Sequence, residues 1–405
     1  MSTSLHTIQQ QESALLIHTY DRVPVLFERG EGVSLFDSEG REYIDFLSGI
    51  GVNALGHGHP AIRAAIAAQT ERLIHVSNLF FHEYQAPLAA RLAVASGLER
   101  AFFCNSGTEA WECALKLARA RYHRASDGKR KPRLLMMKNS FHGRTLGSLA
   151  TTGNPAYRTP FAPMLPGVTF VRFNDVAELE AKFDSSVCAI GMETIQGEGG
   201  VYPASREFLE AARELTRNSG ALLMLDEIQC GLGRTGKMFA YQHHGIQPDI
   251  VTVAKPLAAG LPLGAVLARE DVAASFHPGM HGSTFGGGPL ACAVAVAFLD
   301  EVSRPGFLEH VSTVGTYFAD RLLHLKTRHR SIREVRAVGL MLAVELKSSA
   351  LAKSVVTKMM ERGFIINRTH DVVLRFLPPY IVQARHIDAM VDALDEVLAG
   401  GHANA

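Results

Sequence analysis

Short apolar runs alternate with amphipathic stretches through the middle of the chain. Seven of these runs are candidate strands, and most are continuously apolar, as expected of strands that are buried on both faces; they are residues 101–104, 134–137, 169–172, 188–192, 222–225, 250–253 and 264–268. Between them lie helical patterns such as residues 109–121, where apolar positions recur at i, i+3, i+4, i+7 and i+8 from Ala110, and residues 207–217. This alternation predicts an α/β fold with a large, mainly parallel seven-stranded sheet.

The two ends of the chain have a different pattern. From about residue 290, long helical patterns (291–302 and 308–325) precede a short α/β tail. Residues 1–50 contain a strand–turn–strand pattern (34–37, 38–40 and 42–46) that belongs to no strand–helix unit. We therefore predict a large domain over residues 51–290. An N-terminal segment, residues 1–50, is expected to pack with a smaller α/β domain over residues 291–405.

Composition narrows the class of protein. Of the 405 residues, 47% are hydrophobic and 20% charged, which argues against a disordered chain. The net charge of +1 gives no electrostatic case for nucleic acid or an anionic membrane. The N-terminus lacks the apolar core of a signal peptide, and the longest apolar stretch, residues 289–299, is too short to cross a bilayer. We expect a soluble cytoplasmic protein whose partners are small molecules.

Cysteine and histidine placement gives no metal site. The five cysteines are scattered and form no CxxC pair, which argues against a disulfide framework or a zinc cluster and favours a reducing compartment. The pairs His57/His59 and His243/His244 have no further ligands at metal spacing, so we interpret them as ordinary loop residues.

Polar residues follow five of the predicted strands. They are residues 105–108, 139–144, Glu193, 226–229 and Lys255. Parallel strands bring their carboxyl ends to one edge of a sheet, where open α/β sheets bind ligands. One polar ending satisfies a turn, but five at one edge indicate a binding site.

The segment 105–110 joins a strand to a helix and has two interpretations. Gly107 would let a ligand approach the backbone, and the helix N-terminus after it would attract an anion such as phosphate. Taken alone, the segment favours the second interpretation, a helix cap formed by Ser106 or Thr108.

Lys255 and Asp226 suggest a carbonyl cofactor. A lysine at the mouth of a buried strand is partly desolvated, which favours the neutral amine that forms Schiff bases. A buried carboxylate such as Asp226 needs a cation, and the ring nitrogen of pyridoxal phosphate is one. The alternatives are a lysine that reaches solvent and a structural ion pair.

Residues 231–236 fit the dinucleotide pattern GxGxxG, but the context is wrong. Residues 226–230 separate this pattern from the strand, and no helical pattern begins after Gly236. A nicotinamide-binding fold is therefore disfavoured.

Six ordered motifs together resemble the class III (ornithine/GABA type) pyridoxal-phosphate aminotransferases. They are NSGTEA (105–110), SFHGRT (140–145), ETIQGEGG (193–200), LDEIQCGLGRTGKMFA (225–240), DIVTVAKPLAAGLPLGA (249–265) and GSTFGGGPLA (282–291). The resemblance covers residues 20–398 and implies fold type I with pyridoxal 5'-phosphate as cofactor. Trp111, Thr194 and Gly288 depart from the usual asparagine, proline and asparagine of the family.

The resemblance also implies roles for single residues, carried over by position. Lys255 would form the Schiff base and carry the proton, while Asp226 would bind the ring nitrogen. The remaining cofactor-binding residues would be Ser106, Gly107, Thr108, Phe141, His142, Ile228, Gln229 and, from the partner subunit of a homodimer with shared sites, Thr284. Phe141 and Ile228 would enclose the ring, Gln229 would bind its hydroxyl, and Gly107 and Thr108 would hold the phosphate.

Four further residues would bind the substrates. Arg144 would hold the α-carboxylate, and Ser283 of the partner chain would add a contact. Glu198 would mask Arg375 while the amino donor is bound and release it for the second carboxylate of 2-oxoglutarate.

Within the family, the chain is most similar to the acetylornithine aminotransferases of arginine biosynthesis. The segments that carry this similarity are residues 53–60, 75–85 and 281–293. The expected reaction is transamination of N2-acetyl-L-ornithine with 2-oxoglutarate. The alternatives are ornithine, succinylornithine, a carrier-linked amino acid or 4-aminobutyrate as donor, and an aminomutase that needs no external keto acid.

Overall fold

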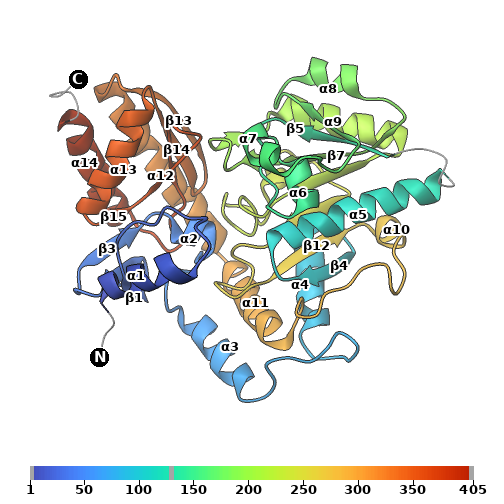
Figure 1. Cartoon of the computed structure of the whole chain (residues 1–405), viewed down its shortest axis with the longest axis horizontal. Helices are drawn as coiled ribbons and strands as arrows, with labels where there is room; N and C mark the ends of the chain where they lie inside the picture. Colours follow the sequence, from blue (N-terminus) through green and yellow to red (C-terminus); the bar gives the residue numbers. More distant parts are fainter. Residues whose placement is uncertain (1–3, 127–131, 401–405) are drawn as a thin grey trace.

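The computed structural model describes residues 4–126 and 132–400, and a seven-stranded sheet forms its largest part (Figure 1). The strand order is β4-β12-β11-β10-β7-β5-β6. The strands are β4 (Arg100–Cys104), β5 (Arg133–Met137), β6 (Val168–Val171), β7 (Val187–Glu193), β10 (Leu222–Asp226), β11 (Ile250–Val253) and β12 (Gly264–Ala268). All seven predicted strands are confirmed, and only β12 runs antiparallel to its neighbours in this sheet.

Helices cover both faces of this sheet, which explains its continuously apolar strands. Alternate residues of β5 belong to different cores: Leu134 and Met136 pack with α5 (Gly107–Ala125), whereas Leu135 and Met137 belong to the core that includes α9 (Arg206–Ser219). Helices α4 (Gln85–Ser96), α8 (Val176–Lys182) and α11 (Pro289–Val302) add to the second core. The helices predicted at residues 109–121, 207–217 and 291–302 are confirmed.

Helix α5 begins directly after the carboxyl end of β4. The Ser106 hydroxyl accepts a hydrogen bond from the Glu109 backbone N–H at 3.3 Å, so Ser106 is the cap. The helix therefore points its N-terminus at the edge of the sheet where the other parallel strands end.

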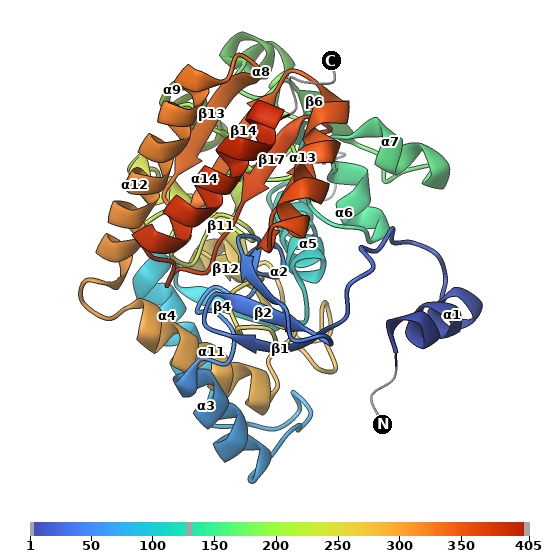
Figure 2. The same cartoon turned by 90° about the vertical axis from the view of Figure 1, so that its left-hand side faces the viewer.

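Both termini contribute to the second half of the molecule. Strands β1 (Phe27–Glu31), β2 (Ser34–Asp37) and β3 (Glu42–Asp45) form a sheet with β15 (Phe364–Ile365), which lies far along the chain. A second sheet has the order β13-β14-β17-β16: β13 (Ile332–Val338), β14 (Met341–Leu346), β17 (Val373–Phe376) and β16 (Asn367–Thr369). Helices α12 (Phe307–Arg328), α13 (Ser349–Glu361) and α14 (Ala384–Gly400) pack beside it (Figures 1 and 2).

Short elements complete the described chain. They are α1 (Leu5–Leu15), α2 (Ser48–Gly51), α3 (Pro60–Thr70), α6 (Leu146–Thr151), α7 (Pro155–Arg158), α10 (Glu270–Ala273), β8 (Ile195–Gln196) and β9 (Tyr202–Pro203). Helix α1 stands apart from the body of the molecule (Figure 2). Over residues 4–126 and 132–400, no helix combines the length and apolar character that a membrane span requires.

Candidate functional site

A cavity of about 420 Å³ lies at the edge of the large sheet where the parallel strands end. Its wall comes from the residues at or after the ends of β4, β5, β7, β10 and β11, from residues 260–263 before β12, and from Val52. The predicted site residues that line it are Ser106, Gly107, Thr108, Phe141, His142, Arg144, Asp226, Ile228, Gln229 and Lys255. The convergence of strand endings that the sequence predicted is therefore present in the fold.

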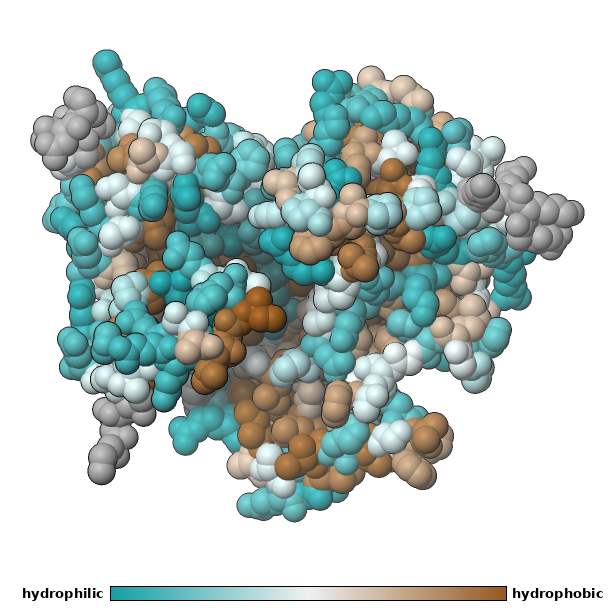
Figure 3. Space-filling view, viewed as in Figure 1, coloured by the Kyte–Doolittle hydropathy of each residue, from teal (hydrophilic) through white to brown (hydrophobic). Residues whose placement is uncertain are grey.

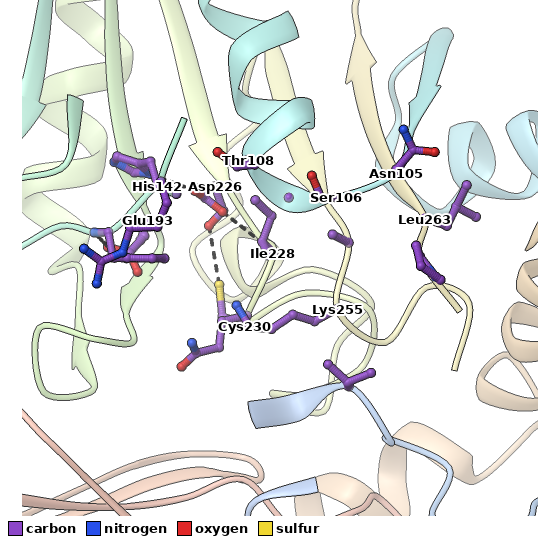
Figure 4. Close-up of a pocket in the computed structure, with 18 of the residues that line it drawn as sticks. Asn105, Ser106, Thr108, His142, Glu193, Asp226, Ile228, Cys230, Lys255 and Leu263 are labelled. Carbon is purple, nitrogen blue, oxygen red and sulfur yellow. Dashed lines mark hydrogen bonds and ion pairs between the residues drawn. The ribbon is translucent and has the colours of Figure 1, made fainter. Parts of the chain in front are cut away.

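Asp226 ends β10 and is held by two donors. Its Oδ2 accepts a hydrogen bond from His142 Nδ1 at 2.7 Å, and its Oδ1 accepts one from the Ile228 backbone N–H at 3.1 Å (Figure 4). The residue is 3% exposed. These contacts orient the carboxylate at the cavity wall.

Lys255 extends from the end of β11 into the space beside Asp226 (Figure 4). Burial lowers the pKa of its amine, while the carboxylates of Glu198 and Asp226 act in the opposite direction. Its Nζ takes part in none of the hydrogen bonds or ion pairs formed between described residues. The site thus presents a desolvated amine without a fixed partner.

The start of α5 forms the side of the cavity nearest β4. A side chain at Gly107 would lie 2.8 Å from Ile228 Cδ1, so only glycine fits between helix and isoleucine. The Thr108 hydroxyl lies 2.9 Å from the Thr145 hydroxyl and 2.6 Å from that of Ser148. This corner therefore offers hydroxyls and unpaired helix N–H groups to an anion.

Glu193, at the end of β7, lines the same cavity. Its two carboxylate oxygens accept hydrogen bonds from the backbone N–H groups of Phe141 and Gly197, each at 3.0 Å. Burial, and secondarily the charge of Asp226, raises the pKa of Glu193 well above its ordinary value. Glu193 thereby ties the segment that carries Phe141 to the loop after β8. The sequence marked it as a strand ending but gave it no role.

Glu227, the residue after Asp226, does not line the cavity. Glu227 is fully buried and accepts hydrogen bonds from the Thr194 hydroxyl at 2.6 Å and from the backbone N–H groups of Ala240 and Tyr241 at 2.8 and 3.1 Å. Burial raises its pKa to about 7 although these three bonds oppose the shift. Glu227 is absent from the cavity wall and braces the loop that follows β10.

Arg144 borders the cavity from an exposed position. Its guanidinium lies over the Tyr157 ring at 3.9 Å and over the Phe141 ring at 5.5 Å from the centroids. It has no hydrogen bond or ion pair with any described residue. Its charge is therefore available to an anion that enters the cavity.

Arg375 contrasts with Arg144 because its donors are already occupied. It lies on β17, is 1% exposed, and donates to Glu198 Oε1 at 2.5 Å, to Gln229 Oε1 at 3.1 Å and to Asn367 Oδ1 at 3.2 Å. Burial alone would raise the pKa of Glu198, but the charge and hydrogen bond of Arg375 hold it below its ordinary value. The structure thus pairs the two residues that the sequence pairs, and Gln229 connects them to the cavity.

Ser283 and Thr284 do not reach the cavity of their own chain. They line a separate cavity of about 910 Å³ together with residues 77–82. The Ser283 hydroxyl accepts a hydrogen bond from Asn105 Nδ2 at 3.2 Å and from the Gly286 backbone N–H at 2.9 Å. Both predicted residues therefore lie outside the wall of the strand-end cavity, and Asn105 links Ser283 to it.

Comparison with known proteins gives the family. The profile of the family "Aminotransferase class-III" matches residues 16–398. The acetylornithine aminotransferase of Methanocaldococcus jannaschii is 46% identical over 381 residues, which cover 94% of this chain and 95% of that protein. The chain belongs to the class III aminotransferase family. This aminotransferase depends on pyridoxal 5'-phosphate, as its family does.

Solved structures agree with this assignment. The aminotransferase has a TM-score of 0.95 to the ornithine aminotransferase of Toxoplasma gondii, at 33% identity, with 100% of this chain and 97% of that chain covered. It has a TM-score of 0.83 to the N-acetylornithine aminotransferase of Stenotrophomonas maltophilia, at 35% identity, with 96% and 99% covered. The predicted type I fold is confirmed.

The cavity fits the cofactor of this aminotransferase. Pyridoxal phosphate needs an amine for its aldehyde, a carboxylate for its ring nitrogen and an anion site for its phosphate. Lys255 offers an unpartnered amine, Asp226 an oriented carboxylate, and Thr108 at the start of α5 a hydroxyl corner. Gly107 leaves the close approach that a side chain would block.

Proposed function

We propose that this aminotransferase moves the δ-amino group of N2-acetyl-L-ornithine to 2-oxoglutarate, giving N-acetyl-L-glutamate 5-semialdehyde and L-glutamate. Such a reaction belongs to arginine biosynthesis. The names of full-length relatives at 44–47% identity support the choice of donor.

The observation that carries this proposal is that two arginines, Arg144 and Arg375, differ in exposure and in pairing. Arg144 is exposed and carries a free charge, which suits the single carboxylate of the donor. Arg375 is buried under Glu198, which suits a second carboxylate that is present only in 2-oxoglutarate and glutamate. This arrangement suits an enzyme whose donor has one carboxylate and whose acceptor has two.

The chemistry depends on Lys255 and Asp226. Bound pyridoxal phosphate supplies an aldehyde that accepts the amino group and a ring that stabilises negative charge at the substrate carbon. Lys255 Nζ would take the proton from that carbon and pass it to C4′ of the cofactor, because its lowered pKa keeps a fraction of the amine neutral. Asp226 keeps the ring nitrogen protonated, since its ionised carboxylate is the acceptor there.

The other cavity residues position the cofactor. Phe141 and Ile228 pack against the two ring faces, Gln229 binds the ring hydroxyl, and His142 fixes Asp226. Ser106, Gly107 and Thr108 hold the phosphate at the start of α5.

The attachment residue can be tested directly. Reduction of the holoenzyme with borohydride, followed by peptide mapping, should find the pyridoxyl label on Lys255, and Lys255→Ala should lose turnover while it keeps the fold. A label on another lysine would contradict the assignment.

Arg144 and Arg375 act in turn on the substrates. Arg144 grips the α-carboxylate of acetylornithine, which leaves the distal δ-amine to reach the cofactor. In the second half of the reaction, Glu198 moves off Arg375, and the freed guanidinium grips the second carboxylate of 2-oxoglutarate.

The active enzyme is a homodimer whose partner chain lends Thr284 to the phosphate and Ser283 to the substrate. The apolar side chains beside their cavity support this, because Leu79, Phe80 and Phe81 are 87%, 66% and 106% exposed in the single chain. The lower part of Figure 3, over α3 and the segment after it, is correspondingly hydrophobic. Light scattering should give a dimer, and an active monomer would contradict the shared site.

Location and domain division are further parts of the proposal. All five cysteines are free and buried, which suits the reducing cytoplasm. The pairing of β3 with β15 supports an N-terminal segment, residues 1–50, that packs with a C-terminal domain over residues 291–405, beside a large domain over 51–290.

A panel of amino donors with 2-oxoglutarate tests the proposed function. We expect N2-acetyl-L-ornithine to give the highest kcat/KM, above ornithine, succinylornithine and 4-aminobutyrate. A preference for one of the others would move the enzyme to another ω-aminotransferase activity. Turnover of a single substrate without any keto acid would indicate an aminomutase instead.

A further inference from the structure

We propose that Trp111 is a positioning residue for the cofactor: its stack on His142 fixes the imidazole, whose Nδ1 proton then orients the Asp226 carboxylate towards the ring nitrogen of pyridoxal phosphate. The inference rests on the proposed role of Asp226. It assigns a function to a residue that lies outside the cavity wall.

Trp111 and His142 form a parallel stack behind Asp226. Their ring centroids are 4.0 Å apart with an interplanar angle of 9°. Trp111 is fully buried on α5, and its indole N–H donates to the Thr151 hydroxyl at 2.9 Å. The His142 backbone N–H donates to the hydroxyl of the adjacent Thr152 at 3.0 Å. Two consecutive threonines at the end of α6 thus fix both members of the stack.

The hydrogen bonds of His142 select one tautomer. Nδ1 lies 2.7 Å from Asp226 Oδ2, and an ionised carboxylate can only accept, so Nδ1 carries a proton. Nε2 is buried and has no hydrogen-bond partner among residues 4–126 and 132–400. A proton on Nε2 would be an unpaired buried donor, at a cost of about 1–3 kcal/mol. The described surroundings therefore favour the neutral ring.

The charge of the cofactor also favours a His142 that carries no positive charge. The protonated ring nitrogen would be one cation at the Asp226 carboxylate, and an imidazolium at 2.7 Å would be a second. A neutral His142 instead orients Asp226 by a hydrogen bond and leaves the carboxylate charge for the cofactor. The attraction of an indole face for a cation, about 0.5–2 kcal/mol, is the opposing effect.

The neighbouring strand leaves room for the indole. A side chain at Gly191, in the middle of β7, would lie 3.2 Å from Trp111 Cη2 and 2.7 Å from Met136 Sδ. Glycine at this position therefore lets the tryptophan lie flat against His142. Strand β7, helix α5 and the segment after β5 together define the stack.

The first experiment uses the unmodified holoenzyme, because Trp111 is its only tryptophan. A protonated imidazole quenches indole fluorescence more strongly than a neutral one, so the emission reports on His142. We expect the emission of the wild type and of His142→Phe to change in the same way with pH. A step that is present in the wild type and lost in His142→Phe would overturn the proposal; a step that persists in His142→Phe arises elsewhere and leaves it standing.

The second experiment separates positioning from packing. Trp111→Leu should weaken pyridoxal phosphate binding by about tenfold and shift the pH dependence of the visible absorption band, whereas Trp111→Phe, which keeps a stacked ring, should stay within about threefold. Phe208→Leu is the matched control, since Phe208 is fully buried on α9 away from the cavity. We expect it to lower the Tm and to leave affinity and band unchanged.

The role of Trp111 can fail separately from that of Asp226. If Trp111→Leu behaves like Phe208→Leu, the residue only fills the core and the proposal is wrong. If Asp226→Asn also leaves affinity and band unchanged, the failure lies in the proposed role of Asp226 rather than in that of Trp111. Should Trp111→Leu not fold, the fluorescence titration of the wild type decides.

Discussion

Arg144 and Arg375 have opposite environments: Arg144 borders the strand-end cavity, whereas Arg375 contacts one of its wall residues, Gln229. Arg144 is exposed and rests on the ring of Tyr157, with no carboxylate partner among the described residues. Arg375 is 1% exposed and donates to Glu198, Gln229 and Asn367. The first guanidinium is available to every anion that enters, whereas the second is available only after a carboxylate has moved. Both arginines are present in the protein, so discrimination between substrates can rest on whether a carboxylate of the protein is already bound to the guanidinium.

Removal of the free arginine should have the largest effect. Arg144→Ala is expected to raise the KM for N2-acetyl-L-ornithine by about 10- to 100-fold, because a charged, bidentate hydrogen-bond pair is lost. The effect on 4-aminobutyrate, which has no α-carboxylate, should be smaller. Steady-state kinetics with both donors measures this. Unchanged acetylornithine kinetics would contradict the assignment.

Replacing Glu198 with a neutral residue should reduce the difference between the two arginines. Glu198→Gln keeps an oxygen near Arg375 but removes the charge, so dicarboxylates should compete with acetylornithine about tenfold better in the donor half-reaction. Single-turnover inhibition by glutarate tests this. Inhibition equal to that of the wild type would show that Glu198 does not mask Arg375.

A neutral contact of Arg375 should matter less. Asn367→Ala removes the acceptor of Arg375 Nε, and the loss of one hydrogen bond, about 1 kcal/mol, should raise the KM for 2-oxoglutarate by roughly fivefold. The KM for acetylornithine is the internal control, since Asn367 has no contact with Arg144. An equal rise for both substrates would point to a general disturbance of β16.

The aromatic support of Arg144 should give the smallest effect. Tyr157→Leu removes the ring that lies 3.9 Å from the guanidinium, which should raise the KM for acetylornithine by about two- to fivefold. Tyr157→Phe retains the ring and serves as the matched variant, expected to stay close to the wild type. Equal kinetics in the leucine and phenylalanine variants would mean that the ring does not hold Arg144.

The apolar runs of the sequence were sufficient to predict the large sheet, because a strand buried on both faces needs an unbroken apolar segment. They did not reveal that β12 is antiparallel, since a run such as residues 264–268 has the same composition in either direction. Strand β1 was not predicted, because its sequence FERGE is mostly polar and half of its pattern faces solvent. The domain boundaries at residues 50 and 290 stay a prediction.

The site shows a similar limit. Strand endings in the sequence predicted that Asp226 and Lys255 would converge, and the resemblance to the family paired Glu198 with Arg375. The stack of Trp111 on His142 was not predicted, because no local pattern joins a helix residue to a loop residue 31 positions later. The burial of Glu227 was likewise not predicted, because its hydrogen-bond partners Thr194, Ala240 and Tyr241 come from two other segments.

Glu227 makes the folding of this aminotransferase a proton-coupled reaction near neutrality. Its pKa is about 7 in the folded chain and 4.5 as the ordinary value, so folding takes up a proton between these two pH values. The stabilisation from this carboxyl is complete below about pH 4.5 and is lost as the pH rises through 7, a change of about 3 kcal/mol in the free energy of unfolding. A rise in pH from about 4.5 to 7 would therefore weaken the brace behind the catalytic strand.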